Sequence, residues 1–267
     1  MRKRFDIVLL DADETVYDFK LAEKTAVSLT LRKFGVEPTD EVVTLYSAIN
    51  LSCWKALERG ELSREDLKPY RFQRLFESLG AEPVDYAAVN DTYEGNLAHQ
   101  AFLLDGALEF VKKLHEHCKI YLATNGLTIP QTGRFNKAAV RPYVDGIYIS
   151  EQIGHSKPDK AYFDYIFTDL GITDKSRVIM VGDSLTSDML GGRNAGLTTC
   201  HYLNGEEPSK SELCDYEIAA YDEFFDILFD TKYQQNTLTS INIAELCEKI
   251  KIIIAIYAKI LKTRVVK

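Results

Sequence analysis

Residues 5–15 read Phe-Asp-Ile-Val-Leu-Leu-Asp-Ala-Asp-Glu-Thr, an apolar run that leads directly into two carboxylates. The short apolar run at 5–10 is typical of a strand covered on both faces in a parallel α/β sheet. Asp11 and Asp13 would emerge at the carboxyl end of that strand, where open α/β sheets bind ligands. Carboxylates at this spacing can serve as a nucleophile and an acid/base that share one metal ion. Alone, the D-x-D-x-T pattern is also compatible with a solvated turn or a helix cap.

Three further segments repeat the arrangement of a short strand followed by polar residues. The predicted strands are 119–123, 146–150 and 177–181. The polar segments after them are Thr124-Asn125-Gly126, Ser156-Lys157-Pro158-Asp159 and Gly182-Asp183-Ser184-Leu185-Thr186-Ser187-Asp188. Hydroxyl and backbone N–H groups at such strand exits bind phosphate oxygens. We therefore expect all four polar segments to meet at one edge of a sheet.

Each of these segments also has an ordinary structural interpretation. A strand-end turn at 124–126, a solvated surface lysine at Lys157 and a helix cap at Asp188 are common features of proteins. Pro158 lies where a helix is expected to begin, which would hold Lys157 in the loop. The order and spacing of the four segments, more than any single residue, indicate a site.

Together the four segments resemble the motifs of the haloacid dehalogenase superfamily of phosphohydrolases. The resemblance covers about residues 4–225. It implies a Rossmann-like parallel sheet in an α/β core, with an inserted α-helical cap domain of the C1 type. In the dehalogenases of this superfamily the second Asp is absent, because a halide leaving group needs no proton. The presence of Asp13 here therefore favours phosphate chemistry.

The resemblance also assigns catalytic roles to individual residues. Asp11 is expected to be the nucleophile that forms an aspartyl-phosphate, and Asp13 the general acid/base. Thr124, Asn125 and Lys157 are expected to bind the phosphoryl oxygens. Neutralisation of those oxygens is needed because a phosphate dianion repels a carboxylate nucleophile.

A Mg²⁺ site is implied by the same resemblance. Asp11, Asp183 and the backbone carbonyl of Asp13 are the oxygen ligands that this hard cation prefers. Asp188 would orient a metal-bound water or bind the metal directly. Mg²⁺ is thus the expected cofactor.

Finer features are similar to the bacterial pyrimidine 5′-nucleotidases of the superfamily. Glu14 stands where many relatives carry Gly, and segments 149–165 and 182–197 continue the pattern. The resemblance implies a cytoplasmic hydrolase of nucleoside monophosphates, which are small phosphate monoesters. A sugar-phosphate phosphatase is the nearest alternative, because only the cap distinguishes the two. A phosphomutase and a non-catalytic phosphate-binding or scaffold module are the remaining alternatives.

The interval 17–100 is too long for a loop and is patterned for helices throughout. Apolar residues at three- and four-residue spacing predict helices within 21–34, 40–58 and 64–79. We therefore expect a core formed by 1–16 and 101–230 and a helical cap at 17–100 that closes over the phosphate.

Four residues of this interval are candidates to face the substrate. Asn50, Trp54 and Arg71 are expected on the cap, and Phe19 at the entrance. Trp54, the only Trp in the chain, could stack on a base. The alternative for Trp54 is an ordinary position in the apolar core of the cap.

Composition agrees with a globular enzyme. The chain has 267 residues, of which 46% are hydrophobic and 27% charged, and a formal net charge of −8. This charge argues against a general binder of nucleic-acid polymers. The five cysteines are scattered without a C-x-x-C pair, and the basic start at 1–4 is not followed by the apolar segment of a signal peptide. We expect reduced thiols, no transmembrane segment and a cytoplasmic protein.

The end of the chain lies outside the resemblance. Residues 231–240 are rich in Ser, Thr and Gln and are expected to form a linker. Residues 241–267 carry an apolar stripe at three- and four-residue spacing and predict an amphipathic helix. Docking on the core and a homodimer contact are favoured for it over an anionic membrane surface.

Overall fold

The computed structural model describes residues 3–208 and 211–230. Contacts divide the chain into one unit of residues 5–221 and a second of residues 1–4 and 222–267. In the second unit, the Arg4 backbone N–H donates to the Leu228 carbonyl of helix α10 (Glu223–Phe229) at 2.9 Å. The predicted linker, C-terminal helix and homodimer contact at 231–267 lie outside the described residues. The predicted domain boundaries stay a prediction.

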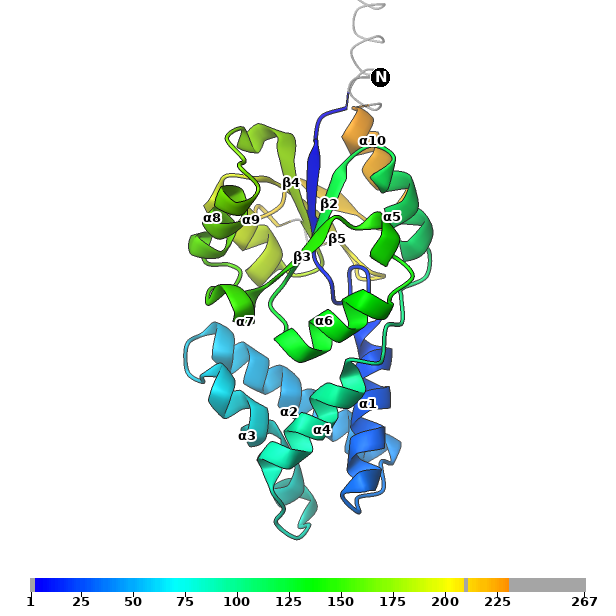
Figure 1. The fold of residues 1–267 in the computed structure, drawn as a ribbon, viewed down its shortest axis with the longest axis vertical. Coiled ribbons are helices and arrows are strands. Elements are labelled where there is room, and N and C mark those ends of the chain that lie inside the picture. Colours follow the sequence, from blue (N-terminus) through cyan, green and yellow to red (C-terminus); the bar gives the residue numbers. More distant parts are fainter. Residues whose placement is uncertain (1–2, 209–210, 231–267) are drawn as a thin grey trace, which may run out of the picture. The chain divides into compact units, whose positions relative to one another are not determined.

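The larger unit is built on a six-stranded parallel sheet with strand order β3-β2-β1-β4-β5-β6 (Figure 1). The strands are β1 (Ile7–Leu10), β2 (Lys119–Thr124), β3 (Gly146–Ile149), β4 (Val178–Gly182), β5 (Thr198–Tyr202) and β6 (Tyr216–Ile218). The chain adds strands first on one side of β1 and then on the other, so the loops that follow β1 and β4 diverge. This reversal opens a crevice at the carboxyl ends.

Helices cover both faces of the sheet, as Figure 1 shows with α8 and α9 on one side and α5 on the other. The helices of the core are α5 (Ala107–His115), α6 (Thr128–Lys137), α7 (Ser150–Ile153), α8 (Lys160–Asp169) and α9 (Leu190–Ala195). Leu9, Met180 and Phe163 belong to one buried cluster between sheet and helices. The continuous apolar strands follow from this two-sided burial, and the predicted parallel α/β core is confirmed.

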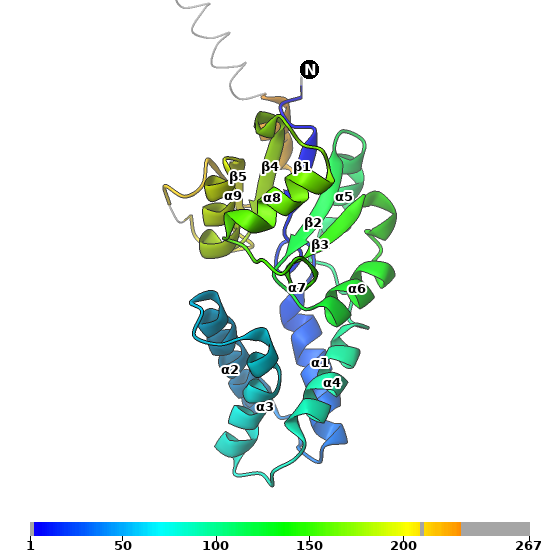
Figure 2. The same ribbon diagram turned by 60° about the vertical axis from the view of Figure 1, so that its left-hand side comes forward.

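Four helices form the insertion between β1 and β2 (Figure 2). They are α1 (Phe19–Lys33), α2 (Asp40–Glu58), α3 (Arg64–Leu79) and α4 (Tyr86–Leu97). Each begins at a side-chain cap that accepts a backbone N–H, namely Asp18, Thr39, Ser63 and Asp85. Such caps satisfy donors that the first helical turn leaves unpaired. The helices share one apolar cluster, which confirms the predicted helical insertion.

Two short linkers join the cap to the core side by side. Tyr17 forms an antiparallel bridge with Leu103. The Leu104 N–H donates to the Val16 carbonyl at 3.0 Å, and the Asp18 N–H to the Phe102 carbonyl at 3.2 Å.

Among the helices of residues 3–208 and 211–230, none is long and apolar enough to cross a membrane.

Burial predicts how two leucines of α1 differ in their contribution to stability. Leu31 is fully buried in the apolar cluster of the cap, whereas Leu29 is 46% exposed. We expect Leu31→Ala to lower the free energy of unfolding by about 2–5 kcal/mol, because it removes buried methyl groups and leaves a cavity. Leu29→Ala, the matched control, should change it by no more than about 0.5 kcal/mol. Urea unfolding of both variants measures this, and equal losses would contradict the packing described.

Candidate active site

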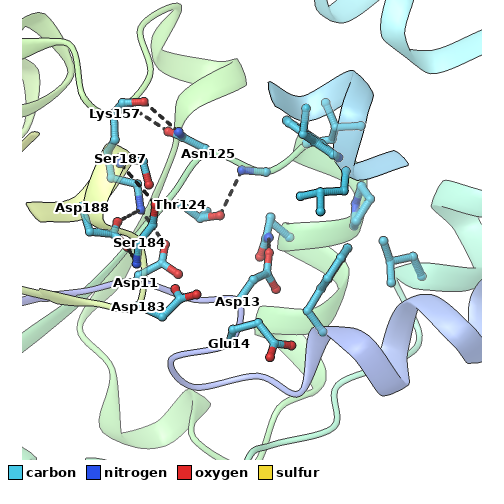
Figure 3. Close-up of a pocket in the computed structure, with 18 of the residues that line it drawn as sticks. Asp11, Asp13, Glu14, Thr124, Asn125, Lys157, Asp183, Ser184, Ser187 and Asp188 are labelled. Atoms are coloured by element: carbon cyan, nitrogen blue, oxygen red, sulfur yellow. Dashed lines mark hydrogen bonds and ion pairs between the residues drawn. The ribbon is translucent and has the colours of Figure 1, made fainter. Parts of the chain in front are cut away.

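The carboxyl ends of β1 and β4 bring three carboxylates together. Asp11 follows β1 directly, and its N–H donates to the Val181 carbonyl at 2.8 Å. Asp183 follows β4, and Asp188 comes from the helical turn after it. One oxygen of each of these three carboxylates lies within 4.8 Å of the others (Figure 3). The sequence prediction that these strand ends converge is thus met in the structure.

Lys157 lies at the centre of this group and is almost fully buried. Its ammonium donates to Asp11 Oδ1 at 2.5 Å, to Asp188 Oδ1 at 2.7 Å and to the Ala123 carbonyl at 2.5 Å. All three N–H bonds of the ammonium are thereby used. Burial would lower the pKa of Lys157, but the two carboxylates outweigh burial and hold that pKa above its ordinary value.

The loop that carries Lys157 is fixed by Asn125. The Asn125 amide donates to the Lys157 carbonyl and accepts the Lys157 N–H, both at 2.8 Å. Thr124 Oγ1 accepts the Gly126 N–H at 3.0 Å. The Asn125 side chain therefore positions Lys157. The predicted phosphate contacts of Thr124 and Asn125 stay predictions.

The electrostatics of the three carboxylates fit a divalent cation. Burial raises the pKa of Asp11 well above its ordinary value, and Asp188 and Asp183 raise it further against the effect of Lys157. Burial and then Asp188 raise the pKa of Asp183 to about 7. In their ionised forms, three carboxylates face one ammonium among the described residues, so negative charge is in excess. A hard cation such as Mg²⁺, which prefers oxygen ligands, fits this donor set.

A π-helical turn and a glycine place Asp188. The turn spans Leu185–Met189, and Asp188 Oδ2 accepts the Ser184 N–H at 3.1 Å. A Cβ at Gly182 would collide with the Asp188 carboxylate. Gly182 therefore permits the close approach of Asp188 to the end of β4. Single π-turns of this kind are frequent at functional sites. Asp188 is buried against Lys157 and does not cap α9.

The Asp13 carboxylate is not part of the three-carboxylate group, because α6 binds both of its oxygens. Arg134 Nη1 donates to Oδ1 at 2.5 Å, and Gln131 Nε2 to Oδ2 at 2.7 Å. A Cβ at Gly126 would collide with the Gln131 side chain, so this glycine allows Gln131 to reach the site. Metal binding through the Asp13 backbone carbonyl stays a prediction.

Sequence reasoning missed Gln131 and Arg134. The signal that could have found them is a pair of polar residues three positions apart on the helix that follows Thr124-Asn125-Gly126, because such residues share one helix face. Arg134 is fully buried, and its guanidinium carbon lies 4.5 Å from the centre of the Tyr17 ring. A buried guanidinium that pairs with a predicted acid/base residue indicates that the arginine influences the carboxylate of that residue.

A cavity of about 290 Å³ extends from the carboxylates into the cap. Phe19, Trp54 and Arg71 line it, and that they face the substrate stays a prediction. Trp54 also packs partly against the apolar cluster of the cap, as the alternative interpretation expects, and its stacking on a base stays a prediction. Asn50 does not line the cavity. Asn50 is buried beside Arg71, and its amide oxygen accepts a hydrogen bond from Arg71 Nη1 at 3.0 Å.

Arg71 is held in the cap by a buried polar network. Its Nη2 donates to Asn90 Oδ1 at 2.7 Å, and Asn90 donates to Glu94 at 2.8 Å. Asn50 in turn donates to Glu23 at 2.6 Å. Among the described residues, Arg71 Nε has no hydrogen-bond partner although it is buried. The network therefore fixes one guanidinium against the wall of the cavity.

Glu14 connects the loop of Asp11 and Asp13 to the cap. It has φ +57°, in the left-handed region that favours glycine. Its carboxylate accepts the Lys20 N–H at 3.0 Å and the Asn204 amide at 3.1 Å. A carboxylate at the first turn of α1 is favourable to the helix dipole. The residue thus holds the start of the cap against the loop of Asp11 and Asp13.

A parallel sheet with this strand order, a helical insertion after β1 and carboxylates at the ends of β1 and β4 define a hydrolase of the haloacid dehalogenase type. The model of the haloacid dehalogenase-like hydrolase family matches residues 5–196. The chain belongs to this family, and its helical insertion is a cap of the C1 type.

The chain is similar to three characterised or solved relatives. It is 34% identical to pyrimidine 5′-nucleotidase PynA of Streptococcus pneumoniae, over 84% of this chain and 95% of the relative. It is 34% identical to pyrimidine 5′-nucleotidase YjjG of Escherichia coli, over 78% and 90%. The crystal structure of the putative HAD-hydrolase YfnB of Bacillus subtilis bound to magnesium matches with a TM-score of 0.79 at 32% identity, over 85% and 99%.

Lys157 should contribute strongly to the stability of the protein when no metal is bound. Lys157→Met leaves two buried carboxylates without their cation, which should lower the free energy of unfolding of chelator-treated protein by about 3–5 kcal/mol. Lys160→Met is the matched control, because Lys160 pairs with Asp164 at the surface, and its effect should stay below about 1 kcal/mol. Adding Asp188→Asn to Lys157→Met should recover part of the loss. Urea unfolding tests the series, and similar effects at Lys157 and Lys160 would contradict the buried ion pair.

Proposed function

We propose that this chain is a Mg²⁺-dependent phosphomonoesterase that hydrolyses nucleoside 5′-monophosphates, in particular those of pyrimidines. The observation that carries the proposal is the largely buried group of Asp11, Lys157, Asp183 and Asp188 at a cavity that residues of the cap also line. Support for the substrate comes from the similarity to PynA and YjjG over most of their lengths. Support for Mg²⁺ comes from the donor set and from the magnesium-bound YfnB structure.

In this proposal, Asp11, Asp183 and Asp188 hold Mg²⁺ together with the Asp13 backbone carbonyl. The ion would supply positive charge to the phosphoryl oxygens. Lys157 adds a permanent positive charge from inside the site and orients Asp11 through its hydrogen bond. Asp11 would then act as the carboxylate nucleophile at the floor of the cavity.

The reaction then takes two displacement steps. In the first, an Asp11 oxygen bonds to phosphorus, the bond from phosphorus to the leaving oxygen breaks, and Asp13 gives its proton to that oxygen. In the second, water attacks phosphorus, Asp13 takes the proton of the water, and the bond from phosphorus to Asp11 breaks. Asp13 returns to its protonated form and Asp11 to its carboxylate, so protons and charge balance over one turnover.

Phosphate release from a panel of nucleoside monophosphates and sugar phosphates, with Mg²⁺, tests the proposal. We expect turnover of pyrimidine monophosphates that falls to background in Asp11→Asn and by about 10²–10⁴-fold in Asp13→Asn. Asp91→Asn is the control, because Asp91 is exposed on α4. Turnover of sugar phosphates alone would retain the mechanism and replace the substrate. Absence of release from every compound would favour a phosphate-binding or scaffold module.

Arg134 should act as a positioning residue for Asp13. Arg134→Met removes the ion pair, so we expect kcat to fall by about 10²-fold with little change in KM. Arg134→Lys, which keeps a cation, should recover part of the loss. In an Asp13→Asn background, Arg134→Met should have no further effect on kcat, because two residues that act as a unit are not additive. Equal effects of Arg134→Met in both backgrounds would show that Arg134 is only structural.

A further inference from the structure

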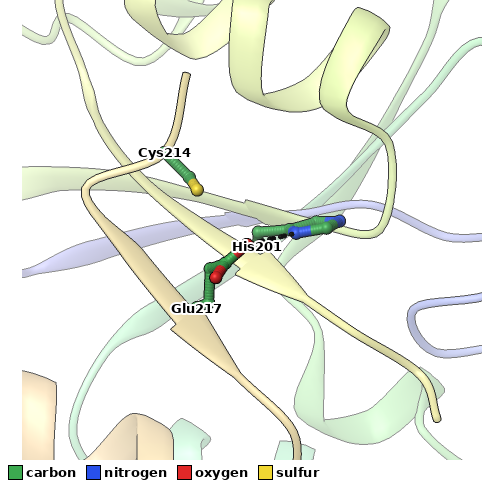
Figure 4. Close-up of side chains that lie close together, drawn as sticks. All are labelled: His201, Cys214 and Glu217. Carbon is green, nitrogen blue, oxygen red and sulfur yellow. Dashed lines mark hydrogen bonds and ion pairs between the residues drawn. The ribbon is translucent and has the colours of Figure 1, made fainter. Parts of the chain in front are cut away.

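A second cluster of metal-ligating side chains lies at the β5–β6 edge of the sheet. His201 on β5 and Glu217 on β6 are direct partners in the parallel register, and Cys214 comes two residues before β6. One ligand atom from each of the three residues lies within 4.8 Å of the others (Figure 4). This set combines nitrogen, sulfur and oxygen, unlike the three carboxylates at Asp11.

The hydrogen bonds of the His201 ring fix which nitrogen could bind a metal. Nε2 lies 2.8 Å from the Asp183 carbonyl, which can only accept, so Nε2 carries a proton. Nδ1 lies 3.4 Å from Glu217 Oε1, which in a carboxylate also only accepts. In a neutral ring, the Nδ1 lone pair therefore faces a carboxylate oxygen. A cation shared by the two atoms makes that contact favourable.

The geometry and the contact to Asp183 are those of a metal-binding histidine. Such a histidine donates its other ring N–H to a backbone carbonyl or carboxylate, which orients the ring. Ligand atoms bound about 2.0–2.3 Å from a tetrahedral zinc ion lie about 3.3–3.8 Å apart. The 3.4 Å between Nδ1 and Oε1 is of this size.

Cys214 makes the cluster selective for a softer cation than Mg²⁺. Burial and then Glu217 raise the pKa of the half-buried Cys214 thiol, so without a metal this residue stays a neutral thiol. A bound Zn²⁺ would displace the thiol proton and take the thiolate as a ligand. Imidazole and thiolate favour zinc, whereas Mg²⁺ prefers oxygen ligands throughout.

We propose that His201 Nδ1, Cys214 Sγ and the Glu217 carboxylate form a binding site for Zn²⁺ or a similar borderline-soft divalent cation. His201 is 4% exposed and the other two ligands are half-buried, which leaves a fourth position for water. The site is separate from the carboxylate site but connected to it, because His201 Nε2 holds the backbone carbonyl of Asp183. A bound ion would fasten β5 to β6 and fix the ring that holds this carbonyl.

Cobalt substitution tests the site without any measurement of activity. The full chain, stripped with a chelator, is titrated with Co²⁺ in the presence of excess Mg²⁺, which occupies the all-oxygen site. We expect a saturable thiolate-to-cobalt charge-transfer band at one ion per chain, which Zn²⁺ removes. Only a site with a sulfur ligand produces this band, so the three-carboxylate group cannot contribute to it.

Three variants decide the assignment. Cys214→Ser should abolish the band, and Glu217→Gln should weaken Co²⁺ binding at least tenfold. Cys247→Ser, at a cysteine outside the described residues, should leave the band unchanged. A wild-type chain without the band would overturn the proposal. A band that persists in Cys214→Ser would overturn it as well.

Discussion

The buried ammonium of Lys157 is the constraint on which the site depends. An ammonium taken out of water is costly unless each N–H finds a partner. The partners of Lys157 come from three separate strand ends: Asp11 after β1, the Ala123 carbonyl on β2 and Asp188 after β4. Its own loop follows β3 and α7 and is fastened by Asn125. One cation therefore couples four crossover connections, and the sheet must be correctly assembled before its charge is satisfied.

The convergence of these strand ends could be predicted because each buried strand leaves a local signal in the sequence. The predicted strands 119–123, 146–150 and 177–181 agree with β2, β3 and β4 to within a residue at each end, because strands buried on both faces are continuously apolar. The strands β5 and β6 were not predicted. Thr198–Tyr202 contains Thr, Cys and His, and its burial comes from neighbours that are distant in sequence. No local pattern reports such burial, so the His201–Glu217 pairing became visible only in the structure.

The site shows the same division between local and distant information. Residues at the end of a strand or directly after it, such as Asp11, Thr124 and Asp183, could be placed from the strand alone. Arg134 lies 121 residues from Asp13 in the chain, and its contact depends on how α6 packs. Asn50 and Arg71 both lie on cap helices that were predicted, yet only Arg71 reaches the cavity. The direction of a side chain on a helix is set by tertiary packing, which a single sequence leaves open.

The chemistry of the substrate explains why the reaction class is better determined than the substrate. Every phosphate monoester presents the same phosphoryl group, and charges buried in the core dictate how that group must be bound. In the proposed reaction the leaving group would meet the cap, where Phe19 and Trp54 offer apolar surface. Apolar contacts discriminate similar groups by only about 1–3 kcal/mol, whereas a buried polar group demands a hydrogen-bonding partner and discriminates more steeply. Two cap residues that line the cavity have a buried polar atom without a hydrogen-bond partner among the described residues: Arg71 at Nε and Tyr93 at its hydroxyl. We therefore expect selectivity for the leaving group to depend on the polar groups of Arg71 and Tyr93 more than on the apolar surface of Phe19 and Trp54.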